Sequence, residues 1–142
     1  MDKAELEKNY LETIYSVFID SVKVDCKVGE LAPPEINELI AKEQSAVVLT
    51  AWNPKSQTLT TTENGKRNNE LLSYLQQRFT VLKAFGQGND VAWPGEESFF
   101  IVGLNKEDAE QLAAEYEQNA YVWFEVDKPV TLEFSRIWRD SF

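Results

Sequence analysis

The sequence predicts a single α/β or α+β domain, in which about four helices flank a mixed β-sheet. Its 142 residues are about the length of one domain. Segments with helical spacing of apolar residues alternate along the chain with short strand-like runs. No internal repeat, low-complexity segment or linker divides it. We therefore expect residues 1–142 to form one globular domain, with residues 135–142 as a candidate C-terminal tail.

Four segments are predicted to be helical, because apolar residues recur in them every three or four positions. Pro33 and Pro34 open the second helix, since proline suits the first turn. Thr62 is the expected N-cap of the third helix. Asn105 is the expected N-cap of the fourth, with Asp108 at the N3 position. The helices are expected at about residues 6–14, 33–40, 62–78 and 105–116.

Strands are predicted where β-branched and aromatic residues form short apolar or alternating runs. Residues 46–52 and 98–103 are continuous apolar runs, as expected of strands that are buried on both faces. Asp127–Pro129 is expected to be a hairpin turn between the last two strands. Residues 16–20 and 22–28 read as one bent strand or a tight strand pair. The remaining strands are expected at residues 79–85, 121–126 and 130–134.

Composition argues against several classes of partner. The chain has 14 Lys and Arg against 24 Asp and Glu, a formal charge of −10, which disfavours contact with nucleic acid. No apolar run is long enough to span a bilayer and the N-terminus is acidic, so we expect a soluble, cytoplasmic protein with no membrane partner. The one cysteine, Cys26, alternates with Val22, Val24 and Val28, and is expected to be a small buried hydrophobic residue.

The absence of histidine narrows the possible chemistry. Without histidine there is no Ser-His-Asp or Cys-His machinery and no imidazole metal ligand. No cofactor and no metal site is predicted. Gly86-Gln87-Gly88 is not followed by the helix that a nucleotide loop requires. Glu96 and Glu97 could bind a hard cation, but read more simply as separate solvated charges.

Polar residues are concentrated after the buried strand at 46–52. In open α/β sheets, ligands lie beyond the carboxyl ends of such strands. Arg67 could clamp a carboxylate or phosphate, while Asn53 and Asn64 supply directional hydrogen bonds. Trp52 or Trp93 could stack on a planar ligand.

A purely structural interpretation of the same residues stays open. Asn53 would then fix the turn by bonding to the backbone, and Arg67 would pair with Glu63 or Glu96.

Four separated motifs occur in order along the chain. They are Ala51-Trp52-Asn53-Pro54-x-Ser56, Glu63-Asn64-x-x-Arg67, Trp93 with Glu96 and Ser98, and Gln118-Asn119-Ala120 before a strand. In this order they resemble the bacterial domain-of-unknown-function family 3293, from about Tyr10 to Trp123. Glu117 stands where the family pattern has a small residue. The resemblance implies a shared fold and polar surface and no activity. It nominates Asn53, Asn64, Arg67, Glu96, Gln118 and Asn119.

Three functions remain open. The leading hypothesis is a small module that binds a polar or anionic small molecule. The second is a protein–protein interaction module that uses an aromatic surface or the tail, with Trp138 and Phe142. The third is an enzyme that uses Glu96 as general acid or base, although no catalytic residue is assigned. The ligand hypothesis places its cleft at Trp52, Asn53, Asn64, Arg67, Trp93, Glu96, Gln118 and Asn119.

Overall fold

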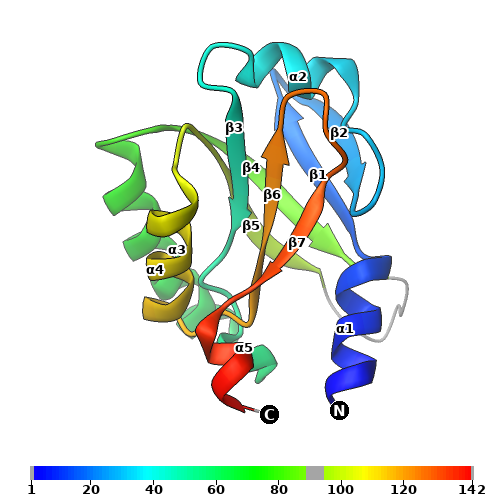
Figure 1. The fold of residues 1–142 in the computed structure, drawn as a ribbon. Coiled ribbons are helices and arrows are strands. Elements are labelled where there is room, and N and C mark those ends of the chain that lie inside the picture. Colours follow the sequence, from blue (N-terminus) through cyan, green and yellow to red (C-terminus); the bar gives the residue numbers. More distant parts are fainter. Residues whose placement is uncertain (1, 89–94, 142) are drawn as a thin grey trace.

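The computed structural model describes residues 2–88 and 95–141, which form a strongly curled seven-stranded sheet with five α-helices (Figure 1). The strands are β1 (Ile14–Ile19), β2 (Val22–Lys27), β3 (Ser45–Leu49), β4 (Thr80–Gln87), β5 (Glu96–Val102), β6 (Ala120–Glu125) and β7 (Thr131–Phe134). The helices are α1 (Lys3–Glu12), α2 (Pro34–Ile40), α3 (Thr61–Gln76), α4 (Lys106–Glu115) and α5 (Arg136–Ser141). The fold is therefore α+β, as the sequence predicts.

The sheet is antiparallel throughout the described residues, where a mixed sheet was expected. Its strand order is β2-β1-β4-β5-β3-β6-β7, and each neighbouring pair is antiparallel. Helix α3 connects β3 to β4, but β5 lies between these two strands. In the same way, α4 connects β5 to β6, and β3 lies between them. Each of these helices joins strands that run in the same direction, yet the intervening strand makes every actual pairing antiparallel.

Several predicted elements are confirmed. Residues 14–27 form a tight antiparallel pair, β1 and β2, and the turn at 127–129 joins β6 to β7. The side chain of Asn105 accepts a hydrogen bond from the Asp108 N–H, as a capping residue should. The N-cap of α3 is Thr60, two residues before the predicted Thr62. Thr60 and Glu63 form a reciprocal capping box, so the helix starts where that box is complete.

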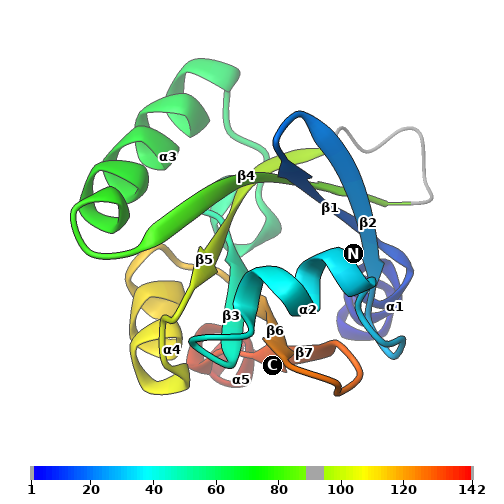
Figure 2. The ribbon, with the colours of Figure 1, turned by 90° about the horizontal axis from the view of Figure 1, so that it is seen from above.

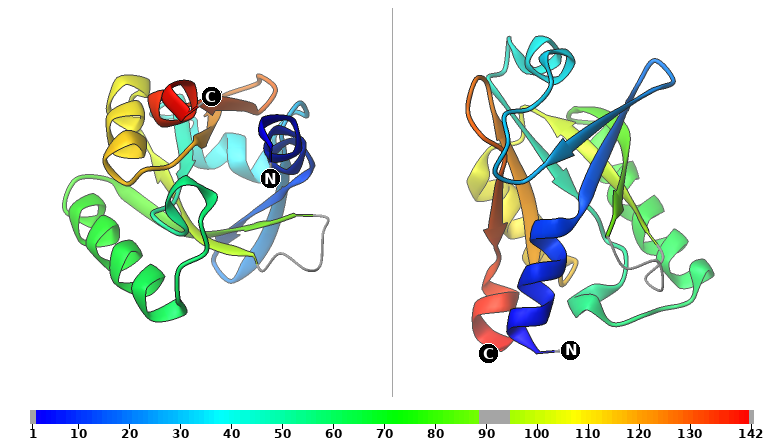
Figure 3. Two further views of the ribbon diagram at one scale, coloured as in Figure 1. Left: turned by 90° about the horizontal axis from the view of Figure 1, so that it is seen from below. Right: turned by 90° about the vertical axis from the view of Figure 1, so that its right-hand side faces the viewer.

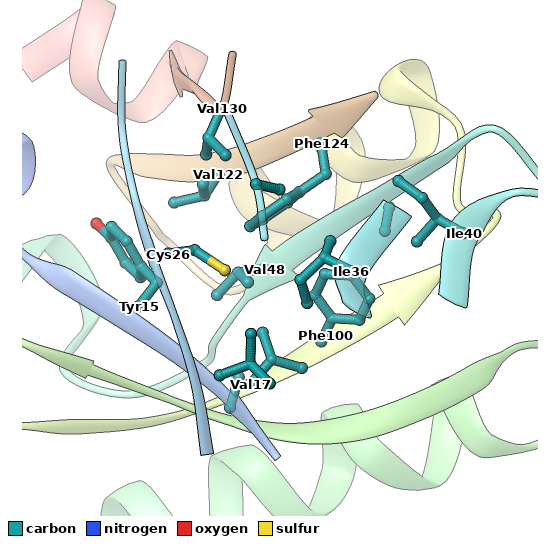
Figure 4. Packing of buried hydrophobic residues seen from close by; sticks show 14 of the residues in the cluster. Tyr15, Val17, Cys26, Ile36, Ile40, Val48, Phe100, Val122, Phe124 and Val130 are labelled. Carbon is teal, nitrogen blue, oxygen red and sulfur yellow. The ribbon is translucent and has the colours of Figure 1, made fainter. Parts of the chain in front are cut away.

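The two faces of the sheet pack against different helices (Figure 2). Ala46 and Val48 of β3 belong to an inner core that also contains residues of α2, whereas Val47 and Leu49 belong to an outer core with α3 and α4. This alternation follows from the two-residue period of a strand. The prediction that this strand is buried on both faces is therefore confirmed. Cys26 is also buried in the inner core, close to Val48 (Figure 4).

One end of the curled sheet is closed and the other end carries α1. Beyond β2, Gly29 N–H donates to Val130 O at 2.8 Å, and Val130 N–H donates to Glu30 O at 2.9 Å, so the two sheet margins meet. Ile36 and Ile40 of α2 fill the inner core at that end and are fully buried. Helices α1 and α5 lie at the opposite end (Figure 3). This second end is where polar residues of the predicted site gather.

The C-terminal segment packs on its own domain. Trp138 in α5 is 3% exposed, and its ring stacks on Phe134 with 4.6 Å between ring centroids. Tyr10 of α1 meets the Trp138 ring edge-on at 6.2 Å. Trp138 is therefore not an exposed interaction residue, and Phe142 lies outside the described residues. None of the described helices is long and apolar enough to cross a membrane.

Candidate functional site

A cavity of about 140 Å³ lies inside the end of the curled sheet that carries α1. Its walls come from α1, the start of β1, the ends of β3 and β4, the start of β5, and strands β6 and β7. The polar residues that line it include Asn53, Glu96 and Gln118 from the predicted site. They also include Tyr10 and Ser56. Segments far apart in the sequence therefore supply one polar lining, which local turn chemistry does not require.

Asn53 is held by three hydrogen bonds, one through its backbone N–H and two through its side-chain oxygen. Its N–H donates to Asn64 Oδ1 at 2.8 Å. Its own Oδ1 accepts from Leu59 N–H at 3.0 Å and from Asn64 Nδ2 at 2.7 Å. Because both lone pairs of that oxygen are used, the amide NH₂ of Asn53 is the group that donates to the Glu96 carboxyl. Asn64, which is 1% exposed, thus orients Asn53 toward Glu96.

Glu96 is the first residue of β5, opposite Gly86 of β4, and its carboxyl lies against the cavity. Burial raises the pKa of Glu96 from its ordinary 4.5 to about 7, and the hydrogen bond from Asn53 acts in the opposite direction. The next residue, Glu97, is exposed, because consecutive strand residues point to opposite faces. The two carboxylates therefore do not form a paired site.

The backbone beside the cavity is strained at several points. Asn53, Lys55, Ser56 and Glu117 all have positive φ, at 46°, 53°, 60° and 55°. The two turns that contain them are joined by a hydrogen bond of 2.7 Å from Lys55 N–H to Glu117 O. The left-handed region is unfavourable for side chains other than Asn, Asp and Gly. The positive φ of Glu117 also explains why the family pattern has a small residue at this position, since glycine fits this conformation best.

Tyr10 and Ser56 form a second polar contact at the cavity wall. Their oxygens lie 2.9 Å apart, and Asn119 Nδ2 donates to Ser56 Oγ at 3.2 Å. Burial raises the pKa of the Tyr10 hydroxyl, and the nearby Glu96 charge adds to this effect. Asn119 therefore supports the wall from behind, while Tyr10 and Ser56 line the cavity itself.

Arg67 binds the backbone instead of lining the cavity. Its Nε donates to Ala51 O at 2.7 Å, and its Nη2 donates to Tyr116 O at 2.5 Å. Within the described ranges it forms no ion pair, so the expected partners Glu63 and Glu96 are not its partners. Arg67 thus connects the end of β3 to the turn after α4.

The remaining predicted residues have supporting positions. Gln118 Nε2 donates to the backbone carbonyl of Trp52 at 3.2 Å, which connects two predicted residues directly. The Trp52 ring belongs to a half-buried residue that does not line the cavity. Trp93 lies outside the described residues. The structure therefore brings Asn53, Glu96 and Gln118 to the cavity and places Asn64, Asn119 and Arg67 around it.

Tyr10 is one of the cavity residues that the sequence analysis missed. Its position in the apolar spacing of the first helix predicted a core residue. The signal in its favour was its hydroxyl, because a buried tyrosine usually finds a hydrogen-bond partner. That partner, Ser56, is 46 residues away in the sequence, and no local pattern indicates it.

A family model described as "Protein of unknown function (DUF3293)" matches residues 49–121, just over half of the chain. The matched span runs from the last residue of β3 into β6 and includes Asn53, Glu96 and Gln118. Tyr10 lies outside it. No curated protein and no solved structure matches the chain. The chain belongs to the family of proteins of unknown function DUF3293.

Proposed function

We propose that this chain binds a small polar molecule in the cavity beside Glu96. One observation carries the proposal: polar side chains from α1, the turn after β3, β5 and the turn after α4 line the same cavity. A set of side chains that served only local turns would not converge in this way. Concave sites with a few placed polar groups in an apolar lining are typical of small-molecule sites.

The local backbone supports the same proposal. Residues in sparsely populated conformations persist where the surrounding structure holds them, and they gather at functional sites. Here the positive-φ residues Asn53 and Ser56 both line the cavity. Such fixed geometry lowers the entropic cost of binding a ligand.

The sequence left a polar and an anionic ligand open, and the contacts of Arg67 support the polar one. The anionic interpretation depended on Arg67 as a charge anchor. Arg67 donates to two backbone carbonyls and is not among the described residues that line the cavity. An anion in the cavity would instead meet the carboxyl of Glu96.

Filling the cavity tests the proposal. Gly86 lines the cavity, and a Cβ there would meet Tyr15 Cε1 at 3.5 Å and Thr13 Cγ2 at 3.6 Å, which are ordinary van der Waals contacts. A polar fragment library is screened by ligand-observed NMR against the wild type, Gly86→Val and the control Gly65→Ala. At Gly65 an added Cβ meets nothing within 4 Å, in a helix outside the cavity.

We expect fragments that bind the wild type and Gly65→Ala but not Gly86→Val. Circular dichroism and thermal unfolding establish that Gly86→Val is folded. If no fragment binds the wild type, or if every binder also binds the filled variant equally well, the proposal is wrong.

General acid–base catalysis is a second candidate function, and a specific observation favours it. Burial raises the pKa of Glu96 to about 7, which suits proton transfer near neutral pH. A bound fragment would be incubated with the wild type, Glu96→Asp and Glu96→Gln, and followed by NMR for conversion. Conversion by the first two and not by Glu96→Gln supports catalysis. Unchanged ligand in every sample excludes it for that ligand.

The proposal includes a cytoplasmic location, no nucleic-acid partner and no cofactor. The single thiol, Cys26, is buried and free, as suits a reducing compartment. A formal charge of −10 supports the absence of nucleic-acid binding.

A further inference from the structure

The charged side chain of the described cavity lining is acidic. Among the described lining residues, Glu96 is the one acidic side chain, and neither Lys nor Arg is present. Two cationic side chains of neighbouring segments have other partners: Arg67 donates to Ala51 O and Tyr116 O, and Lys55 Nζ lies 3.7 Å from the Glu117 carboxylate. A buried carboxylate without a cation is costly, and a cationic ligand would offset that cost.

Several hydroxyl groups of the lining donate their protons to other groups of the protein, which leaves their oxygens as hydrogen-bond acceptors. Thr50 Oγ1 donates its proton to Glu97 O at 2.6 Å, and Ser98 Oγ donates to Glu96 O at 3.2 Å. Tyr10 and Ser56 share one hydrogen bond, so only one of their two protons remains free. With the Glu96 carboxylate, these hydroxyl oxygens give the cavity several acceptors close to one negative charge. An ammonium group has three donors and no acceptor, which complements this lining.

The rest of the lining is aromatic and apolar. The rings of Tyr10, Tyr15 and Tyr121 line the cavity, and aromatic faces attract cations. Val48 and Leu132 also line it and offer contact to a hydrocarbon chain. The two kinds of wall together suit a molecule that has a cationic head and a short apolar body.

We propose that the cavity selects a small primary amine, whose ammonium group contacts the Glu96 carboxylate and the neighbouring hydroxyl oxygens while its hydrocarbon part lies against Val48 and Leu132. This inference rests on the proposed function and names the chemical class of its ligand. Asn53, whose NH₂ donates to the same carboxyl, keeps Glu96 in position for the amine.

The test compares three probes of one size, n-butylammonium, n-butanol and butyrate, by ¹H–¹⁵N NMR titration at pH 7.5. Wild type, Glu96→Gln and Glu97→Gln are titrated in parallel, because Glu97 is the exposed neighbour and provides a matched loss of charge. We expect butylammonium to bind the wild type at least tenfold more tightly than butanol and butyrate, with shifts at Asn53 and Glu96. Glu96→Gln should weaken butylammonium at least tenfold, and Glu97→Gln less than twofold.

Two results overturn the inference, and they differ in meaning. If butanol or butyrate binds at the cavity as tightly as butylammonium, the amine class is wrong while binding at the cavity stands. If butylammonium affinity is the same in Glu96→Gln, Glu96 is not the amine's partner. If none of the probes moves the cavity signals and the fragment screen is also negative, the proposed function fails as well.

Discussion

Two side chains define the chemistry of the cavity at the scale of single residues. Asn53 uses its carbonyl oxygen for Leu59 and Asn64, so that its NH₂ faces Glu96. Glu96 is in turn withdrawn from bulk water, which favours its neutral form. The pair is therefore oriented by the protein and not by a ligand.

Glu96→Gln should change how stability depends on pH. The pKa of Glu96 is about 7 in the folded protein against an ordinary value of 4.5, so the unfolded chain ionises first as pH rises. The Glu96 contribution to stability is complete below about pH 4.5 and is lost as the pH rises to 7. Urea unfolding should show Glu96→Gln nearly equal to wild type at pH 4 and more stable at pH 8 by about 2–3 kcal/mol.

Glu97→Gln serves as the control, since Glu97 is exposed on the other face of β5. It should follow the wild type at both pH values. A Glu96→Gln difference that does not grow with pH would mean that the Glu96 carboxyl is as solvated as an ordinary surface glutamate.

Arg67→Lys should lower stability. Arg67 reaches two carbonyls, Ala51 O and Tyr116 O, with two separate nitrogens. A lysine ammonium lacks the fixed fork that spans them. Chemical denaturation should show a loss of about 1–3 kcal/mol in the free energy of unfolding. Arg78→Lys is the matched control, because the exposed Arg78 makes one backbone bond, to Tyr74 O, and a ring contact with Tyr74 at 4.0 Å, and it should lose about 1 kcal/mol or less. An equal effect of both substitutions would contradict the structural role of Arg67.

Helix α3 illustrates how a whole element positions the site. Its capping box fixes the start of the helix, and Asn64 and Arg67 follow on adjoining turns. Gly65 lies between Asn64 and Arg67, and a Cβ added there would meet nothing within 4 Å. Helix α3 therefore has a strong start and one weak position.

Gly65→Ala should strengthen this helix. A glycine inside a helix is less favourable than alanine by about 0.5–1 kcal/mol, and the added Cβ at Gly65 has nothing within 4 Å to clash with. The free energy of unfolding should rise by about that amount, measured in urea. Lys66→Gly, at an exposed position inside the same helix, is the converse change and should destabilise. A loss of stability in Gly65→Ala would show that the position is not open.

Helix α1 covers the cavity and is the least buried of the long helices. None of its residues is fully buried, and Tyr10 contributes the hydrogen bond that connects it to Ser56. Local opening requires less free energy where few apolar contacts hold a segment. Access to the cavity is therefore expected through movement of α1.

Tyr10→Phe should loosen α1 and leave the rest of the fold unchanged. Loss of one hydrogen bond, worth about 1 kcal/mol, should raise amide hydrogen exchange in residues 3–12 about fivefold. The control is Tyr116→Phe, which removes the 3.3 Å bond from Tyr116 to Glu70 and lies outside α1. Equal exchange rates in α1 for wild type and Tyr10→Phe would rule out the Ser56 contact as the tie that holds this helix.

Across the whole molecule, local patterns predict elements well and pairings poorly. The buried strand predicted at 46–52, the turn at 127–129 and the cap at Asn105 follow from residue spacing and turn chemistry and are confirmed, although the strand ends at Leu49. For residues 16–28 the sequence left one bent strand and a tight strand pair open, and the structure has the pair. The antiparallel insertion of β3 between β5 and β6 does not follow from local patterns. Helix α3 carries the chain past the place that β5 occupies later, and α4 carries it past β3, which comes earlier in the sequence. Topology of this kind depends on contacts between residues far apart in the sequence.

The site shows the same division between local and distant contacts. Asn53 and Glu96 were recognisable because polar residues interrupt the ends of apolar runs. The role of Arg67 was not, since its acceptors are backbone carbonyls, which every residue carries. Tyr10 was missed because the curl of the sheet brings α1 to the turn at Ser56.

The most direct test is a ¹³C NMR titration of the Glu96 side-chain carboxyl in the wild type, assigned by its loss in Glu96→Gln. Burial inside the cavity predicts a midpoint near pH 7, well above the ordinary 4.5 of a glutamate. Addition of n-butylammonium should lower that midpoint, because a nearby cation favours the carboxylate. A midpoint near 4.5 in the free protein would contradict the account, since Glu96 would then lie in open water and not in a cavity.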